Sequence, residues 1–247
     1  MLKKSVLSLV IRALLCSATL ASVAIAQDGA PTAGQAAVAQ APAENWQVRR
    51  LKTLDLIRVM KDEKADKAQR DAALRAFDGV LTRFDKVPYG FTPMEAMDLY
   101  QLFYVPKDAG KIEANLLMLA WTATLGWYDA LRFADESGRN EIINKEQFFN
   151  RALSSRSKEV VAFLEKEPQR AEAAVEAGIN SARNMHAAMQ SHYDIRWPQA
   201  YGDLARQCTV QGGKNCARPA ELPAHKWPGA FEEAAAAVKG YYRFNKK

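Results

Sequence analysis

The stretch from Ile112 to Ala134 constrains the fold of this chain more than any other. It has no charged side chain between Glu113 and Asp129, a run of 15 residues, and its apolar residues cover every side of a helix instead of one stripe. A helix that is apolar all round lies either deep in a protein core or in a membrane. Because a membrane span needs about 20 predominantly apolar residues, the stretch predicts a central core helix surrounded by other helices.

The first 26 residues have the three parts of a secretory signal peptide. Three basic residues open the segment, a short apolar run follows, and residues 24–26 form the small-x-small site Ala-Ile-Ala. This order is typical of a signal that is removed from the mature protein. We expect cleavage after Ala26, a mature chain that begins at Gln27, and a periplasmic or secreted location.

The signal also changes the charge of the chain. It carries three of the 34 basic residues and no acidic residue, so the mature chain has 31 basic against 28 acidic residues, a net charge of +3 instead of +6. No run of five or six Lys or Arg residues appears, whereas a basic tract or stripe is typical of nucleic-acid binding. We therefore expect no nucleic-acid partner.

Residues 27–45 predict a flexible tether, because this Ala-, Gln- and Pro-rich segment has too little apolar surface to bury. From residue 46 to residue 247 the apolar residues recur at helical spacing almost throughout, and no segment alternates convincingly with period two. The predicted helices include residues 139–153, residues 158–167, which stop before Pro168, and residues 197–208. In the predicted helix 66–85 one face is apolar, and it consists of Ala73, Phe77, Val80, Leu81 and Phe84. The sequence predicts one all-α domain, a bundle of about eight helices around the apolar helix 112–134, with no transmembrane segment in the mature chain.

One predicted helix, residues 169–193, has an unusually regular seam. Its members alternate at steps of four and three, as in a coiled coil, and they are Ala171, Val175, Gly178, Ala182, Met185, Met189 and His192. A glycine inside a helix destabilises it by about 1 kcal/mol relative to alanine, so Gly178 needs a packing reason. We expect this seam to approach helix 112–134 closely.

Two cysteines remain after removal of the signal, Cys208 and Cys216. In an exported protein such a pair is expected to form a disulfide. Closing this short loop stabilises the fold by about 2–3 kcal/mol in the loop-entropy model. The C-x-x-C spacing that is typical of redox proteins is absent, so we predict a structural disulfide.

Residues 89–104 form the most aromatic part of the chain. Thr92, Pro93 and Glu95 supply an N-cap, a first-turn proline and a capping-box partner in the right order for a short helix. Around this helix, Tyr89, Phe91, Tyr100 and Tyr104 are candidate binding residues, because exposed aromatic side chains are typical of recognition surfaces. Core packing of the same side chains is the alternative, since aromatic residues are mostly buried.

One catalytic alternative rests on residues 136–140, Glu-Ser-Gly-Arg-Asn, which follow the long apolar helix. They resemble the Glu-Ser start of the active-site segment in lytic transglycosylases and goose-type lysozymes. The resemblance covers about five residues and implies a glycan-cleaving enzyme with Glu136 as the general acid, a role that needs a raised pKa in an apolar cleft. The Gly-rich stretch of those families is missing, because residues 141–165 contain no glycine.

A second alternative is copper binding by Met185, Met189 and His192, which share one helical face. Soft Met and His ligands suit copper, although Met is also a routine gap-filler in protein cores. No phosphate loop, dinucleotide fingerprint or nucleophile motif occurs in the sequence. We therefore predict no cofactor and no resident metal.

Export, a well-specified helical core and the thin set of catalytic candidates favour a binding protein over an enzyme. We expect a periplasmic helical protein that binds a protein partner in the cell envelope, as an inhibitor or immunity-type protein or as an envelope accessory factor. The glycan-cleaving enzyme and the copper binder remain the alternatives.

Overall fold

The computed structural model describes residues 45–87, 90–102, 109–145, 158–188, 193–213 and 216–241. Within these ranges all regular elements are helices, apart from one isolated antiparallel bridge between Phe133 and Glu221. The predicted all-α class is confirmed. The predicted signal peptide and residues 27–44 of the predicted tether lie outside the described residues.

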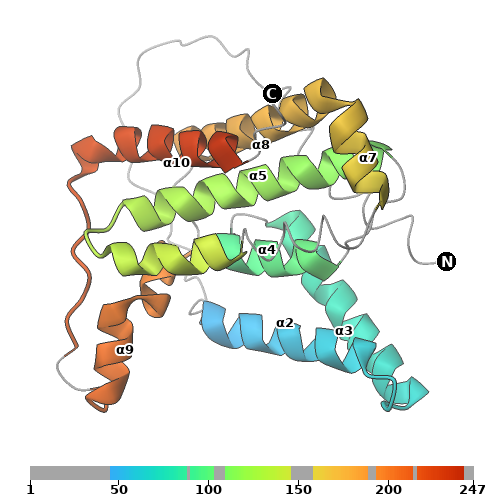
Figure 1. Ribbon diagram of the computed structural model, residues 1–247. Helices are drawn as coiled ribbons and strands as arrows, with labels where there is room; N and C mark the ends of the chain where they lie inside the picture. The colour runs from blue at the N-terminus through green and yellow to red at the C-terminus, as the bar shows by residue number, and fades with distance from the viewer. Residues whose placement is uncertain are drawn as a thin grey trace, which may run out of the picture. The chain divides into compact units, whose positions relative to one another are not determined.

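Figure 1 shows the described helices in chain order, coloured from blue to red. Residues 139–145 are also helical, and the rest of the predicted helix 139–153 lies outside the described ranges. The named elements are α2 (Trp46–Lys61), α3 (Lys67–Lys86), α4 (Pro93–Leu102), α5 (Ala109–Leu131), η4 (Glu136–Gly138), α7 (Lys158–Lys166), α8 (Pro168–Ala188), η5 (Trp197–Tyr201), α9 (Asp203–Val210), η6 (Ala224–Lys226) and α10 (Trp227–Tyr241).

The described residues divide into two compact units, which lie within Met1–Pro88 and Tyr89–Lys247. In the first unit α2 and α3 pack against each other. The predicted apolar face of α3 is buried at Ala73, Phe77, Leu81 and Phe84. The predicted single domain over residues 46–247 stays a prediction.

Two helices begin with the hydrogen bonds of a capping box. At α4 the Glu95 amide donates to the Thr92 hydroxyl at 3.2 Å, and the Thr92 amide donates to the Glu95 carboxylate at 2.9 Å. The same exchange joins Asp66 and Gln69 at the start of α3. The predicted start of the 93–102 helix is confirmed, because these two bonds satisfy backbone donors that a helix leaves without partners.

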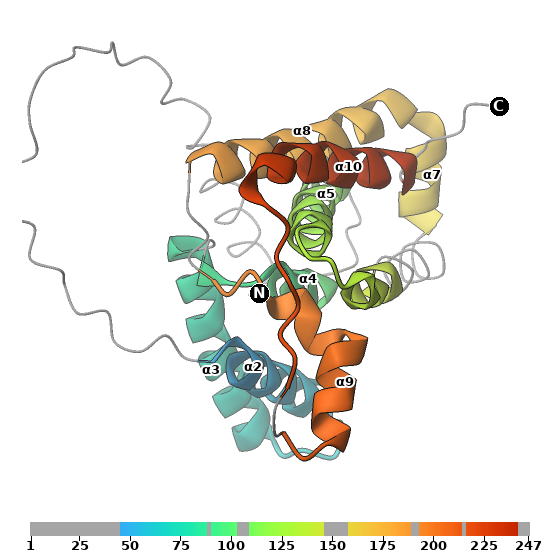
Figure 2. The same ribbon diagram turned by 90° about the vertical axis from the view of Figure 1, so that its left-hand side faces the viewer.

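In the second unit α5 has helices on two opposite sides. Figures 1 and 2 both show α8 and α10 along one side and α4 along the other, and all three pack directly against α5. Most side chains of α5 are buried, including the polar Asn115, Thr122 and Thr124. The two threonine hydroxyls donate to carbonyl groups one turn earlier in the helix, so their burial leaves no donor unpaired.

The approach of α8 to α5 is close because α8 has no side chain at Gly178. A Cβ atom there would overlap the Leu117 carbonyl oxygen, and it would lie 2.8 Å from Ala120 Cβ and 2.9 Å from the Trp121 amide nitrogen. Ala171 and Ala182 of the same seam are completely buried. The predicted close approach of the small-residue seam to this helix is confirmed.

One predicted helix, residues 197–208, is instead two elements. The chain forms the 3-10 helix η5, becomes extended at Gly202 with ψ of 171°, and starts again as α9. A Cβ atom at Gly202 would lie 2.9 Å from both the Asp135 carboxylate and the Ser137 hydroxyl. The break therefore depends on a distant segment, which helical spacing does not reveal.

A short extended segment leads from α9 back towards α10. The Leu222 amide donates to the Arg132 carbonyl at 2.7 Å, and the Ala134 amide donates to the Ala220 carbonyl at 3.0 Å. These bonds attach the segment to the chain just after α5. Within the described ranges, no helix combines the length and apolar character that a membrane crossing needs.

Candidate functional site

The structure places Phe91, one of the four predicted binding aromatics, in the core. Its side chain is 4% exposed, and every residue from 91 to 99 is buried. Tyr89 and Tyr104 lie outside the described residues, as does the side chain of Tyr100. The described part of the aromatic segment is therefore a buried helix and its cap.

Glu136 lies on the surface in η4. Its side chain is 75% exposed and forms an ion pair with Arg139, with 3.3 Å between carboxylate oxygen and guanidinium nitrogen. A general acid of the predicted kind needs an apolar surrounding that holds its proton. Because the described environment of Glu136 is solvent and a cation, the geometry does not favour the glycan-cleaving role.

Met185 is the only predicted copper ligand among the described residues, where it is 9% exposed. Met189 and His192 lie outside them. In the part of the chain that the structure describes, no three His, Cys, Asp or Glu side chains gather into a group able to hold a metal ion. The copper alternative gains no geometric support, and we assign no metal ligand.

A buried ionic cluster that helical spacing did not predict lies at the C-terminal end of α5. Asp129 is 1% exposed, and one carboxylate oxygen accepts a charge-assisted hydrogen bond from Arg132. The other oxygen accepts from the Tyr193 hydroxyl at 2.9 Å and from the Trp197 indole N–H at 2.8 Å. Both oxygens are occupied, so this carboxylate holds the segment 193–197 against α5.

Burial dominates the electrostatics of this cluster. It raises the pKa of Asp129 above its ordinary value, against the opposing effects of Arg132 and the two other donors. Burial and the neighbouring Asp129 charge raise the pKa of Tyr193 well above its ordinary value. Tyr193 therefore stays a neutral donor. The only sequence signal for the cluster is an Asp and an Arg three positions apart at the end of an apolar run.

An aromatic junction joins this cluster to α8 and α10. The Arg132 guanidinium lies 4.4 Å from the centroid of the Tyr128 ring, and the Tyr128 hydroxyl lies 3.2 Å from His186 Nε2. The imidazole stacks on Phe231 of α10, with 5.6 Å between centroids. Burial and then the Arg132 charge lower the pKa of His186, so neutral solution leaves the imidazole uncharged.

The segment 135–138, which contains Glu136, holds the start of α9. The Ser137 hydroxyl accepts from the Asp203 amide at 2.7 Å and donates to the Asp135 carboxylate. Gly138 allows η4 to approach η5, because a Cβ atom there would lie 2.9 Å from the Pro198 carbonyl oxygen. These contacts give the segment a structural role that its sequence did not reveal.

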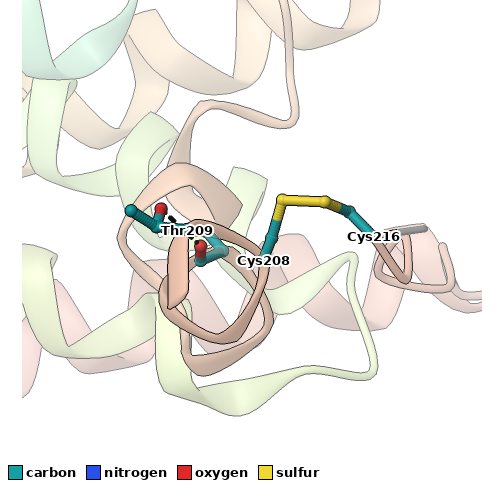
Figure 3. Close-up of a disulfide and its surroundings, with 4 residues drawn as sticks. Cys208, Thr209 and Cys216 are labelled. Carbon is teal, nitrogen blue, oxygen red and sulfur yellow. Dashed lines mark hydrogen bonds between the residues drawn. A yellow bond between two sulfur atoms is a disulfide. The ribbon is translucent and has the colours of Figure 1, made fainter. Parts of the chain in front are cut away.

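The far end of α9 is tied by the predicted disulfide. Figure 3 shows the bond from Cys208 in α9 to Cys216, whose Cα atoms are 5.0 Å apart. Between them, Gly212 and Gly213 have φ of 70° and 75°, a left-handed conformation that glycine adopts without strain. The predicted pairing of Cys208 with Cys216 is confirmed.

The helix between these two attachments buries none of its eight residues. Val210 at its end is 88% exposed. Figures 1 and 2 both show α9 extending away from the layer of α5, α8 and α10. A groove of about 310 Å³ follows one face of the helix and is lined by Asp203, Arg206, Gln207, Val210 and Gln211. We call α9 and the turn residues 211–213 the α9 tip.

No family model, no curated protein and no solved structure matches this chain.

Proposed function

We propose that this protein is an exported, non-catalytic helical binding protein that recognises a protein partner in the cell envelope through its α9 tip. This class of binding protein includes inhibitors, immunity-type proteins and envelope accessory factors. The observation that carries the proposal is an ordered helix that buries none of its own residues and presents an 88% exposed Val210.

The α9 tip adds little to the stability of the core but is attached at both ends. An isolated helix of fewer than about 12 residues is marginal in water, and α9 has eight. It is nevertheless held by η5, by the Ser137 hydrogen bond and by a disulfide. Attachments that order a surface element before binding reduce the entropy lost on association. This arrangement suits recognition by a helix in a partner's groove.

The α9 face also favours a protein over a charged ligand. Asp203 and Arg206 form an ion pair with each other, so the face has little net charge to attract a nucleic acid or a charged lipid surface. Gln207 and Gln211 lie one turn apart beside Val210. Amide side chains both donate and accept hydrogen bonds, which suits the backbone groups of a polypeptide.

Affinity capture from envelope extract tests the proposal with a matched pair of substitutions. The mature protein should recover a stoichiometric protein partner, and Val210→Asp should lose it. Val48→Asp introduces the same change on α2, where Val48 is 45% exposed, and should retain the partner. Burial of a valine side chain is worth about 1.5 kcal/mol, so we expect the Kd for the recovered partner to rise at least about tenfold in Val210→Asp.

Two results would count against this function. Recovery of no stoichiometric partner would argue against a binding protein of this kind. Equal capture by wild type and Val210→Asp would place the binding surface elsewhere on the chain.

The exported location is a separate part of the proposal and has its own test. It is supported by the basic start, the apolar run and the Ala-Ile-Ala site of residues 1–26. Fractionation of expressing cells should place the protein in the periplasm or medium, and N-terminal sequencing should begin at Gln27. An intact Met1 in a cytoplasmic fraction would contradict export.

A further inference from the structure

The start of α9 is bonded directly, and its far end is connected indirectly, to one short stretch, residues 132–138, which we call the latch. At the N-terminal end the Asp203 amide donates to the Ser137 hydroxyl at 2.7 Å. Ser137 is held in turn by Asp135, whose carboxylate accepts from the Ser137 amide at 3.0 Å and from the Ser137 hydroxyl. The first backbone donor of α9 is thus satisfied by a side chain 66 positions away in the sequence.

The C-terminal end of α9 reaches the latch indirectly. The disulfide joins Cys208 to Cys216, at the start of the extended segment that leads to α10. That segment is bonded to the other half of the latch through the backbone of residues 132 and 134. The backbone bonds of residues 132 and 134 therefore hold the segment that carries the far side of the disulfide, while Ser137 holds the start of the helix directly.

The helix lacks a cap of its own. Its N-cap residue is Gly202, which forms no side-chain hydrogen bond. The first amides of a helix need acceptors, and a side-chain oxygen there stabilises the helix. Ser137 provides that acceptor, and the nearby Asp135 carboxylate suits the positive end of the helix dipole. With no buried residue, α9 depends on these contacts to stay helical.

We infer that α9 is a separately unfolding element whose helical state is controlled by the latch through Ser137. Proteins open in local cooperative units, and binding elements are drawn from the less stable ones. The role in recognition rests on the function proposed above, whereas the local unfolding does not. Loss of the Ser137 hydrogen bond should unfold the ordered face of α9 and leave the packing of α5 with α8 and α10 intact.

Hydrogen exchange of the mature protein, without any partner, tests this inference. In Ser137→Ala, amides of residues 203–210 should exchange about five- to tenfold faster, the effect of losing an N-cap, while those of α5 and α8 keep their rates. Ser137→Thr retains the hydroxyl and should restore slow exchange. Ser181→Ala is the matched control, because the Ser181 hydroxyl donates back to the Ala177 carbonyl within α8.

Wild-type protein supplies a second measurement that needs no variant. In low denaturant, the free energy of the opening that exposes α9 amides should fall less steeply with denaturant concentration than the free energy of the opening that exposes α5 amides. The inference is overturned if α9 exchanges only with global unfolding, if Ser137→Ala leaves its rates unchanged, or if the rates rise equally in α5 and α8. Since the readout needs no partner, failure of the capture experiment leaves it standing.

Discussion

Replacement of Gly178 by alanine tests the close contact between α8 and α5. The new Cβ atom would overlap the Leu117 carbonyl oxygen and lie 2.9 Å from the Trp121 amide nitrogen. Both neighbours are backbone atoms of α5, so they cannot move aside by changing a rotamer. Real Cβ atoms do not approach so closely, and the two helices must separate.

The expected loss can be worked out from two opposing effects. Alanine in place of glycine favours a helix by about 1 kcal/mol, whereas overpacking a tight core costs about 1–3 kcal/mol and occasionally more. The upper part of that range applies here, because the conflict involves helix backbones. We expect Gly178→Ala to lower the free energy of unfolding by about 1–2 kcal/mol. At this chain length that corresponds to a fall in Tm of about 2–8 °C.

Gly79 in α3 offers the matched control. A Cβ atom there would meet nothing within 4 Å, so Gly79→Ala should stabilise the protein by about 0.5–1 kcal/mol. Urea unfolding followed by circular dichroism measures both variants. A Gly178→Ala variant as stable as wild type, or changes of the same sign in the two variants, would contradict the close contact of α8 with α5.

Three further predictions follow from the buried groups and the disulfide. Burial lowers the pKa of His186. The contribution of this histidine to stability is therefore complete above the unfolded pKa of about 6.5 and falls as the pH drops towards the lower folded pKa. In urea unfolding at a series of pH values, His186→Gln should reduce this acid-dependent loss of stability, whereas the exposed His225→Gln should retain the loss. Asp129→Asn leaves a buried guanidinium without its counter-charge and should cost about 3–5 kcal/mol; a loss below about 1 kcal/mol in urea unfolding would contradict the importance of the pair. Replacing Cys208 and Cys216 by serine should lower stability by about 2–3 kcal/mol and speed exchange in α9; unchanged α9 exchange would show that the disulfide does not hold the helix.

The sequence predicted helices well where the residues that start, end or bury a helix lie close together in the chain. The start of α4 followed from Thr92, Pro93 and Glu95, whose hydrogen bonds are confirmed. The end of α7 before Pro168 and the buried face of α3 followed from proline chemistry and from helical spacing. Gly178 was more informative still, because an unfavourable residue inside a helix indicated close packing against helix 112–134, which the structure confirms.

The candidate site depended on contacts that spacing does not encode. Residues 136–140 predicted a catalytic segment when taken alone, yet Ser137 contacts an amide far along the chain. Asp129 is only one acidic residue at the end of an apolar run until Tyr193 and Trp197 reach it. The break at Gly202 had the same origin, since the atoms that exclude a side chain there belong to Asp135 and Ser137.

Periodicity, capping residues and cysteine spacing thus specify the all-α class, several helix starts and the disulfide, because each depends on neighbours a few residues away. Tertiary structure decided which polar groups are buried, where η5 ends and α9 begins, and which helix is left exposed. Those outcomes depend on pairs separated by more than 60 positions, such as Ser137 with Asp203 and Asp129 with Trp197. Hydrogen bonds over such separations form only when the chain has packed, so no local sequence pattern predicts them.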